Sequence, residues 1–336
     1  MNIPTVVFTR PRDWNQGHYF SNLLNLVYVP ISGDVPKKRS GRLAGDGIGD
    51  VLTTLGVRTL LMQIDELKPE IFFHSIHAKI THPLLKKIRE KSPKTKIVVM
   101  DGNFPNDVSK YVKEHRKFVD AVLLNHDDPA VLQAYKKAEF ASNQIGLLWD
   151  GFVLEEHPTP VHYTKTIYDC FFAGSNLRDN KQVHFYPGGK FRQSFILQVK
   201  DRFRLALYGY QKEWPIPVIG RATHIEYYKA FHVAKITLGA NHLDLHRYYT
   251  RRTIHSGASG RMFITKYIPG MEEDFENHKH LVWFKNITEG LNLIDSYLQN
   301  DKARETVAAQ GRKLFLERHS WEARLREFER FVYALL

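Results

Sequence analysis

Short apolar runs alternate with amphipathic segments along the first half of the chain. The amphipathic segment at residues 83–91 places Leu84, Leu85 and Ile88 on one face at helical spacing. Four apolar runs have the length of buried β-strands, and they span residues 5–8, 71–73, 97–100 and 121–124. This alternation predicts an α/β domain with a parallel sheet.

A second series of strands begins after residue 166. Its four apolar runs span residues 170–173, 205–208, 236–238 and 262–265. Two helices are expected to close the chain, the first over residues 302–317 and the second after Ser320, which suits a helix N-cap. Residues 155–165 contain Pro158 and Pro160 and lack periodicity, so they are the expected linker.

The pattern therefore predicts two α/β halves. We place the first domain at residues 1–157 and the second at residues 166–318. The closing helix, within residues 319–336, is expected to pack back on the first domain.

Composition supports a globular protein with an unusual charge. Hydrophobic residues make up 43% of the 336 residues, and no apolar run approaches the ~20 residues of a membrane span. The single cysteine, Cys170, excludes an intramolecular disulfide, so we expect a cytoplasmic protein. The net charge of +12 is concentrated between Arg178 and Arg261, where 15 Lys or Arg face five Asp or Glu. Such a stretch favours a phosphate-bearing partner, whether a nucleotide, a nucleic acid or an anionic surface.

Polar side chains follow several predicted strands. Ligands bind at the carboxyl ends of strands in open α/β sheets, so these positions are the first candidates for chemistry. In the first half they are His18, His74, His77 and Asp101. A histidine there can transfer protons or bind hydroxyl groups, and Asp101 can act as a general base or cap the next helix. In the second half they are Gly174, Ser175 and Arg178.

The segment Tyr248–Thr265 is the most informative. Arg251 and Arg252 precede the small residues Ser256–Gly260. Small residues at a helix N-terminus expose amide donors to a phosphate, and a guanidinium neutralises its charge. The alternative is a small-residue helix packed tightly on a sheet.

One pair of histidines and one pair of aspartates are weak candidates for a metal site. His74 and His77 lack a third metal ligand at suitable spacing. Asp127 and Asp128 precede Pro129 and an apolar helical pattern, which indicates a helix N-cap in preference to a metal site. We therefore predict no metal site.

An ordered set of motifs resembles the CgeB-like, or spore-maturation-type, glycosyltransferases. The similarity is strongest between residues 227 and 331, and a weaker match begins at Phe172-Ala173-Gly174-Ser175. The motifs that carry it are Tyr228-Lys229-Ala230, Ile236-Thr237-Leu238, Arg251-Arg252, Ser256 to Gly260, Pro269-Gly270-Met271-Glu272-Glu273-Asp274-Phe275, Ala309-Gln310-Gly311-Arg312 and His319-Ser320-Trp321.

The resemblance implies the GT-B fold, with two Rossmann-like domains facing a central cleft and a C-terminal helix crossing back to the N-terminal domain. It implies a metal-independent reaction without a resident cofactor. The co-substrate would be a nucleoside-diphosphate sugar, and a UDP-sugar is the first candidate. Retention or inversion stays open. The resemblance assigns the donor diphosphate to Gly174, Ser175, Arg178, Lys181, Arg251, Arg252, Ser256 and Gly257.

One position departs from the family pattern. Related enzymes place a glutamate that holds the ribose where this chain has His255, which offers one donor and one acceptor. On the acceptor side, His77 matches a histidine that such enzymes keep near the sugar, and His18 and Asp101 are expected beside it.

The sequence thus predicts a glycosyltransferase that acts on a hydroxyl acceptor. The basic charge makes a modified base in DNA one candidate acceptor, and binding would then fall steeply with salt. The alternative is a non-catalytic protein that binds nucleic acid or an anionic polymer on a degenerate glycosyltransferase fold.

Overall fold

The computed structural model describes residues 4–9, 25–29, 54–78, 80–102, 107–154, 157, 166–176, 188–222 and 225–336. They form two compact units. The N-terminal unit comprises Met1–Asn125, Pro129–Leu148 and Leu325–Leu336. The C-terminal unit comprises His126–Asp128 and Trp149–Arg324.

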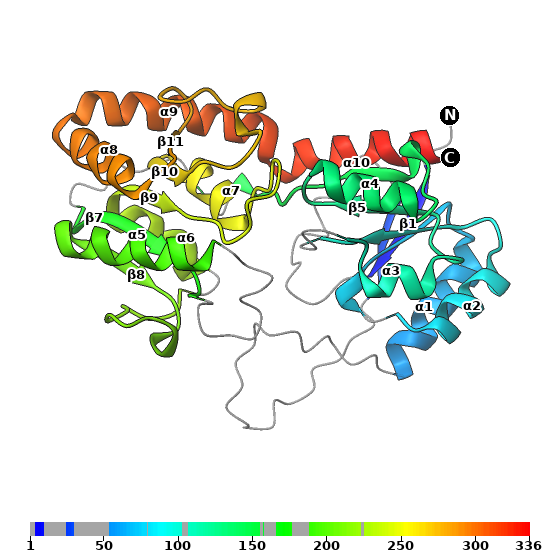
Figure 1. Ribbon diagram of the computed structural model, residues 1–336. Helices are drawn as coiled ribbons and strands as arrows, with labels where there is room; N and C mark the ends of the chain where they lie inside the picture. Colours follow the sequence, from blue (N-terminus) through cyan, green and yellow to red (C-terminus); the bar gives the residue numbers. More distant parts are fainter. Residues whose placement is uncertain are drawn as a thin grey trace. The chain divides into compact units, whose positions relative to one another are not determined.

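The N-terminal unit is built on a six-stranded parallel sheet with the order β2-β1-β3-β4-β5-β6 (Figure 1). The four strands that the apolar runs predict are present as β1, β3, β4 and β5, and β2 and β6 form the two edges. The bounds are β1 Thr5–Thr9, β2 Asn25–Tyr28, β3 Ile71–Ser75, β4 Lys96–Met100, β5 Ala121–Leu124 and β6 Ile145–Leu147.

Helices cover both faces of this sheet. Successive side chains of a strand point to opposite faces, so neighbouring residues pack in different layers. Phe72 of β3 packs in the core shared with the helices between the strands, whereas Phe73 lies against Phe328 and Val332 of the last helix. The last helix, drawn in red in Figure 1, therefore packs on the N-terminal sheet, as predicted. The helices of this unit are α1 Thr54–Leu67, α2 His82–Lys91, α3 Lys110–His115, α4 Pro129–Lys137 and α10 Trp321–Leu335.

The C-terminal unit contains a five-stranded parallel sheet with the order β11-β10-β9-β7-β8. Four of these strands are predicted by the sequence, and β11 is an additional edge strand. The bounds are β7 Tyr168–Ala173, β8 Leu205–Tyr208, β9 Ala234–Gly239, β10 Met262–Lys266 and β11 Val282–Phe284.

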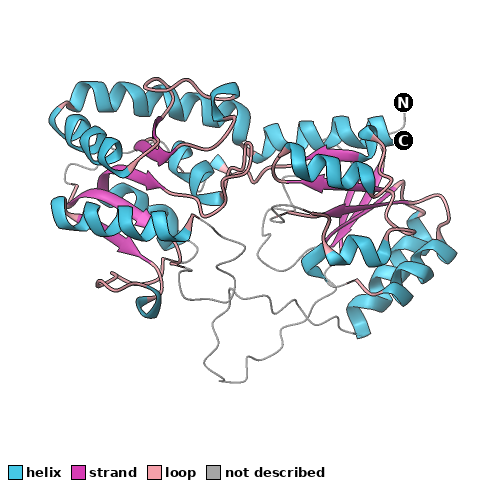
Figure 2. Ribbon diagram, viewed as in Figure 1, coloured by secondary structure: helices cyan, strands magenta, loops and turns pink. Residues whose placement is uncertain are grey.

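Helices again cover both faces of the sheet (Figure 2). Phe172 packs with Phe195 of α5 on one side, and the adjacent Phe171 packs with Phe231 on the other. The helices are α5 Gly189–Arg202, α6 Ile225–Ala230, α7 Arg251–Ala258, α8 Ile287–Gln299 and α9 Asp301–His319. The prediction of an α/β protein with two parallel sheets is confirmed.

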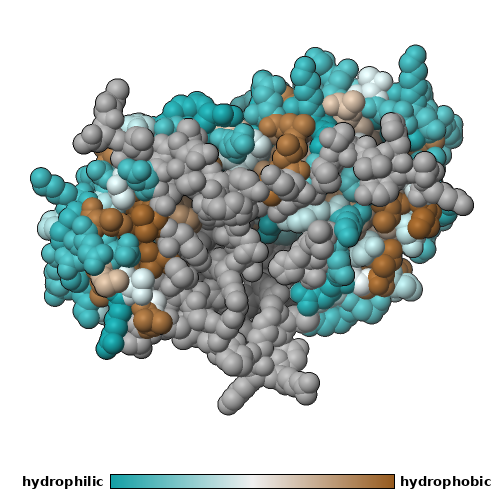
Figure 3. Space-filling model, turned by 180° about the vertical axis from the view of Figure 1, so that it is seen from behind, coloured by the Kyte–Doolittle hydropathy of each residue, from teal (hydrophilic) through white to brown (hydrophobic). Residues whose placement is uncertain are grey.

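On the face shown in Figure 3, the hydrophobic atoms form separate patches among hydrophilic ones. None of the described helices combines the length and the apolar character needed to cross a bilayer.

Candidate functional site

The candidate site lies at the carboxyl ends of β7 and β9. β7 pairs with β8 on one side and with β9 on the other, so the strand order reverses at β7. In open parallel sheets the connections diverge at such a point and leave a crevice that binds ligands. The loop Gly174–Asn176 follows β7, and Ala240 follows β9.

Arg252, in the first turn of α7, reaches both strand ends. Its guanidinium donates hydrogen bonds to the carbonyl oxygens of Ala173 at 2.9 Å and Ala240 at 3.2 Å, and it lies over the Phe172 ring at 4.7 Å. The residue is only 9% exposed, and this burial lowers the pKa of Arg252. A cation is therefore fixed at the switch point.

Gly174 is a glycine because Arg252 approaches it closely. A Cβ atom at this position would lie 2.6 Å from Nη1 of Arg252, well inside van der Waals contact. The Gly174 carbonyl accepts a hydrogen bond from the indole Nε1 of Trp214 at 3.1 Å, which fixes the loop. The structure thus brings together Gly174 and Arg252, which the sequence places 78 positions apart.

A second guanidinium, that of Arg192 on α5, joins the same strand ends. Its Nε donates to the carbonyl of Ala240 at 2.7 Å, and its Nη1 donates to the carbonyl of Ser175 at 2.9 Å. Its Nη2 contacts Nδ1 of His242 at 2.6 Å. Arg192 is 1% exposed, and burial together with the charge of Arg252 lowers its pKa well below the usual range of arginine.

Arg192 is not among the predicted site residues, although its position carries a signal. Arg192 precedes Phe195, Ile196 and Val199 at helical spacing, and all four side chains are buried on one face of α5. A cation on the apolar face of a helix is unusual, because buried charges are costly unless they are paired.

Neither guanidinium contacts a carboxylate within the described ranges. Arg192 and Arg252 donate only to neutral backbone carbonyls and to an imidazole. Two positive charges are thereby buried next to each other without a compensating carboxylate among the described residues. This arrangement favours the binding of a multivalent anion.

The start of α7 differs from the prediction. Thr250 caps the helix, which therefore begins at Arg251. The two arginines thus form its first turn. Ser256 and Gly257 fall in its last turns, where an α-helix commits the amides to carbonyls four residues earlier. The expectation that these two amides are donors at a helix N-terminus is therefore wrong. A Cβ at Gly257 would lie 2.2 Å from the Phe315 ring, so this glycine allows α7 and α9 to pack closely.

His255 is buried in a group of aromatic rings. Its Nδ1 lies 2.8 Å from Nε2 of His157, and its Nε2 accepts a hydrogen bond from Nε of Arg251 at 3.4 Å. The Tyr227 and Tyr228 rings lie 5.8 and 5.1 Å away. Because the accepting Nε2 carries no proton, Nδ1 is the donor to His157. Both nitrogens of His255 are thus engaged within the protein, and burial lowers its pKa well below the usual range.

In the N-terminal unit, Asp101 lies directly after β4 and is 2% exposed. The Tyr135 hydroxyl donates a short hydrogen bond to its carboxylate. Burial raises the pKa of Asp101, which makes it a stronger base than an exposed carboxylate. His74 is fully buried at the end of β3, and His77 lies in the turn Ile76–Ala78 that follows.

Three predicted site residues, His18, Arg178 and Lys181, lie outside the described residues. The same holds for the expected linker at residues 155–165, except for His157, which is buried. Burial, together with the charges of the neighbouring His232 and Arg312, lowers the pKa of His157 to about 3.

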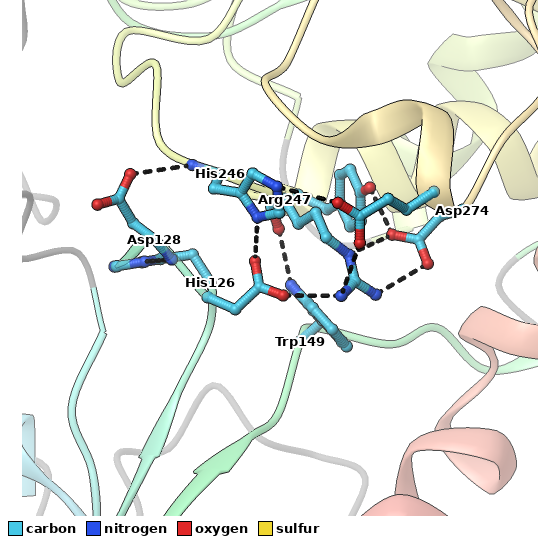
Figure 4. A network of polar contacts seen from close by, with 9 residues as sticks. His126, Asp128, Trp149, His246, Arg247 and Asp274 are labelled. Carbon is cyan, nitrogen blue, oxygen red and sulfur yellow. Dashed lines mark hydrogen bonds and ion pairs between the residues drawn. The ribbon is translucent and has the colours of Figure 1, made fainter. Parts of the chain in front are cut away.

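Asp127 forms ion pairs with His246 and Arg247, which are labelled in the network of Figure 4. Its two oxygens lie 2.6 Å from Nδ1 of His246 and 2.7 Å from Nη1 of Arg247. Arg247 also forms two hydrogen bonds with Asp274, at 2.8 and 2.9 Å. The carboxylate that the sequence assigns to a helix cap therefore holds two basic side chains. The described part of the chain contains no group of three His, Cys, Asp or Glu residues placed to bind a metal ion.

The comparisons with known proteins agree with this architecture. Residues 192–330 match the model of a family described as glycosyl transferase-like. No curated protein sequence matches the chain significantly.

Several solved structures share the fold over nearly the whole chain. A glycosyltransferase from Rickettsia africae superimposes with a TM-score of 0.61 at 10% identity, covering 100% of this chain and 99% of that one. Sucrose-phosphate synthase from Thermosynechococcus elongatus gives a TM-score of 0.60 at 9% identity, with 97% and 98% covered. The Anabaena protein HepE, in complex with UDP and glucose, gives 0.55 at 9% identity, with 97% and 98% covered.

The match that begins at Arg192 includes β8 to β11 and Arg252, but not the loop after β7. Residues 192–330 thus carry the pattern of a glycosyl transferase-like family, on a chain with the two-domain GT-B fold of glycosyltransferases.

Proposed function

We propose that this protein transfers a sugar from a nucleoside-diphosphate sugar to a hydroxyl group. The observation that carries the proposal is the pair of buried guanidiniums, Arg192 and Arg252, at the switch point of the C-terminal sheet. They have the charge and the hydrogen-bonding capacity to bind a diphosphate, which carries at least two negative charges. The glycosyl transferase-like pattern of residues 192–330 supports the same ligand.

The donor diphosphate would lie between the loop after β7 and the N-terminus of α7. Gly174 and Ser175 supply a loop without bulky side chains next to Arg252. The first turn of α7 adds the positive end of the helix dipole. Arg178 and Lys181 enter the proposal as further phosphate ligands on the strength of the sequence alone.

His255 has a different role in this proposal from the one that the resemblance implies. Both of its ring nitrogens already bond to protein groups, so it has no acceptor to offer a ribose. We propose that it orients Arg251, whose Nε donates to it, toward the donor. UDP is the first candidate nucleotide, and the HepE complex, which contains UDP and glucose, supports this choice.

The reaction requires stabilisation of the departing diphosphate and a base for the acceptor. The two guanidiniums would stabilise the negative charge that develops on the leaving group, so no metal ion is needed for that step. Asp101 is the proposed base, because its pKa is raised by burial, and His77 and His18 are proposed beside it from the sequence. The fold and the comparisons give no support to a DNA acceptor, and the proposal leaves it out.

A calorimetric screen of UDP, GDP, dTDP and ADP tests the donor site. One of them is expected to bind to the wild-type protein, and Arg252→Ala is expected to weaken that binding about ten- to hundredfold, since a charge-assisted hydrogen bond contributes about 1.5–3 kcal/mol. Arg202→Ala, which removes an exposed cation from the end of α5, is the matched control and should bind normally. Equal nucleotide affinity in the Arg252 variant would remove the site assignment.

A second measurement separates the enzyme from its non-catalytic alternative. Slow hydrolysis of the bound sugar nucleotide, followed by release of the nucleoside diphosphate, is expected of a transferase without its acceptor. A protein that binds nucleotides and yet never releases the sugar, with any acceptor, would be a binding protein on this fold.

A further inference from the structure

Asn176, the last described residue of the loop after β7, has an unusual environment. The residue is 4% exposed, yet neither its amide Nδ2 nor its carbonyl Oδ1 has a hydrogen-bond partner within the described part of the protein. Its main-chain N–H donates to Oε2 of Glu213 at 3.1 Å, so the backbone at this position is held in place. A buried carboxamide with both ends unpaired destabilises a fold, because both atoms lose their bonds to water.

This carboxamide follows directly on the part of the loop that both guanidiniums contact. The preceding residue, Ser175, accepts a hydrogen bond from Arg192, and Gly174 lies in close contact with Arg252. A ligand bound by the two arginines would therefore lie next to Asn176. Such a ligand would supply the partners that the two side-chain atoms lack among the described residues.

The two atoms restrict the chemistry of the missing partner. Phosphate oxygens accept hydrogen bonds and would satisfy Nδ2 only. Oδ1 needs a donor, so the partner must both donate and accept, as hydroxyl groups do. A sugar attached to the diphosphate supplies such groups beside the phosphate site.

We propose that Asn176 binds hydroxyl groups of the transferred sugar and so selects which sugar the protein accepts. This inference rests on the proposed function, because it takes the ligand of the two arginines to be a sugar nucleotide. It adds a specificity-determining residue in the loop after β7. The buried carboxamide of Asn176 lowers the stability of the free protein and forms its hydrogen bonds only with the bound donor.

The test is the substitution Asn176→Leu, which keeps the size of the side chain and removes both polar atoms. We would measure the affinity for the best-binding nucleoside diphosphate of the screen above and for its sugar nucleotides with glucose, galactose and N-acetylglucosamine. The variant should bind the nucleoside diphosphate as the wild type does and the preferred sugar nucleotide about tenfold or more weakly, which corresponds to one or more lost hydrogen bonds. Asn292→Leu, the same change at an exposed position of α8, should alter neither affinity.

Thermal unfolding without ligand gives an independent readout. Because the carboxamide is unpaired, Asn176→Leu should unfold at the same temperature as the wild type or a higher one. A lower unfolding temperature would show a structural role for Asn176, and an equal loss of affinity for the nucleoside diphosphate would place its partner in the nucleotide. Either result would overturn the inference.

Monodeoxy analogues of the preferred sugar nucleotide complete the test. Removal of the hydroxyl that Asn176 contacts should weaken binding to the wild type and leave binding to the variant unchanged, which is the signature of a direct contact in a double-mutant cycle. Additive effects for every analogue would contradict the contact. If the wild type bound no nucleotide at all, the proposed function and this inference would both fall, whereas unchanged sugar binding in the variant would remove the inference alone.

Discussion

Arg192 and Arg252 donate hydrogen bonds to the same acceptor, the carbonyl oxygen of Ala240, at 2.7 and 3.2 Å. One guanidinium comes from α5 and the other from α7, and the shared carbonyl lies at the carboxyl end of β9. The carbonyl offers two lone pairs and only a partial negative charge, so it positions both cations without neutralising them. The positive charge therefore stays available to a ligand.

This shared acceptor predicts that Arg192 is needed for its shape as well as its charge. In Arg192→Lys the charge is retained, but an ammonium group cannot span Ala240, Ser175 and His242 as the planar guanidinium does. We expect nucleotide affinity to fall about tenfold or more, as for the loss of one charge-assisted hydrogen bond. Calorimetry would measure the nucleotide affinity of this variant. Arg202→Lys, at an exposed position of the same helix, is the control and should bind as the wild type does. Full affinity in the Arg192 variant would show that charge alone suffices.

The close contact at Gly174 gives a second prediction. Gly174→Ala places a Cβ 2.6 Å from Nη1 of Arg252, so the guanidinium must move and nucleotide affinity should fall. Gly189→Ala is the matched control, because a Cβ there meets nothing within 4 Å. Since Gly189 is helical, its replacement should stabilise the protein by about 0.5–1 kcal/mol. Nucleotide titrations of both variants would check this, and equal affinities would mean that the guanidinium is free to shift.

These features show how far the sequence could predict the fold. The eight strands that it predicts are present, because each is a buried run of β-forming residues. The three that it misses, β2, β6 and β11, are all edge strands of three or four residues. Only the middle residue of β6 is buried, and only the two end residues of β11 are buried. Over three residues such an apolar pattern is too short to recognise.

The candidate site was predicted only in part, for a different physical reason. Gly174 and Arg252 follow strand ends, and a parallel sheet brings such positions together whatever their separation in sequence. Arg192 lies inside a helix, so its role depends on tertiary contacts that local patterns do not contain. The start of α7 was predicted at the small residues Ser256 and Gly257, which are typical of a phosphate-binding helix N-terminus, whereas the helix begins at Arg251 after its cap Thr250.

Asp101 should affect turnover and not nucleotide binding. If it is the base, Asp101→Asn is expected to lower kcat about a hundred- to ten-thousandfold, the usual contribution of general base catalysis. Tyr135→Phe, which removes only the hydroxyl that donates to Asp101, should cause a smaller loss. Steady-state kinetics with nucleotide calorimetry would separate the two effects. A variant with normal kcat would exclude Asp101 as the base.

The proposed use of guanidiniums in place of a metal ion gives a further prediction. Transfer or hydrolysis should proceed at the same rate with and without a strong chelator, since Arg192 and Arg252 would stabilise the leaving diphosphate themselves. Initial rates measured after exhaustive treatment with the chelator would check this. Lost activity that returns on addition of Mg²⁺ or Mn²⁺ would contradict the proposal.

The buried His74 predicts how the stability of the protein depends on pH. Its ring is fully buried between Phe72 and Tyr111, and this burial lowers its pKa to about 4 from the usual 6.5. In the unfolded chain the same histidine binds a proton below pH 6.5, so the unfolded state gains protons first and stability falls between pH 6.5 and about 4. Over this range a single such group can change the free energy of unfolding by roughly 3 kcal/mol.

His74→Phe, which keeps an aromatic ring in the same place, should reduce the slope of unfolding free energy against pH in this window. At pH 8, where His74 is neutral in both states, the slope should be the same in both proteins. Denaturant titrations at a series of pH values would measure it, and parallel curves for the two proteins down to pH 4 would show that His74 does not resist protonation.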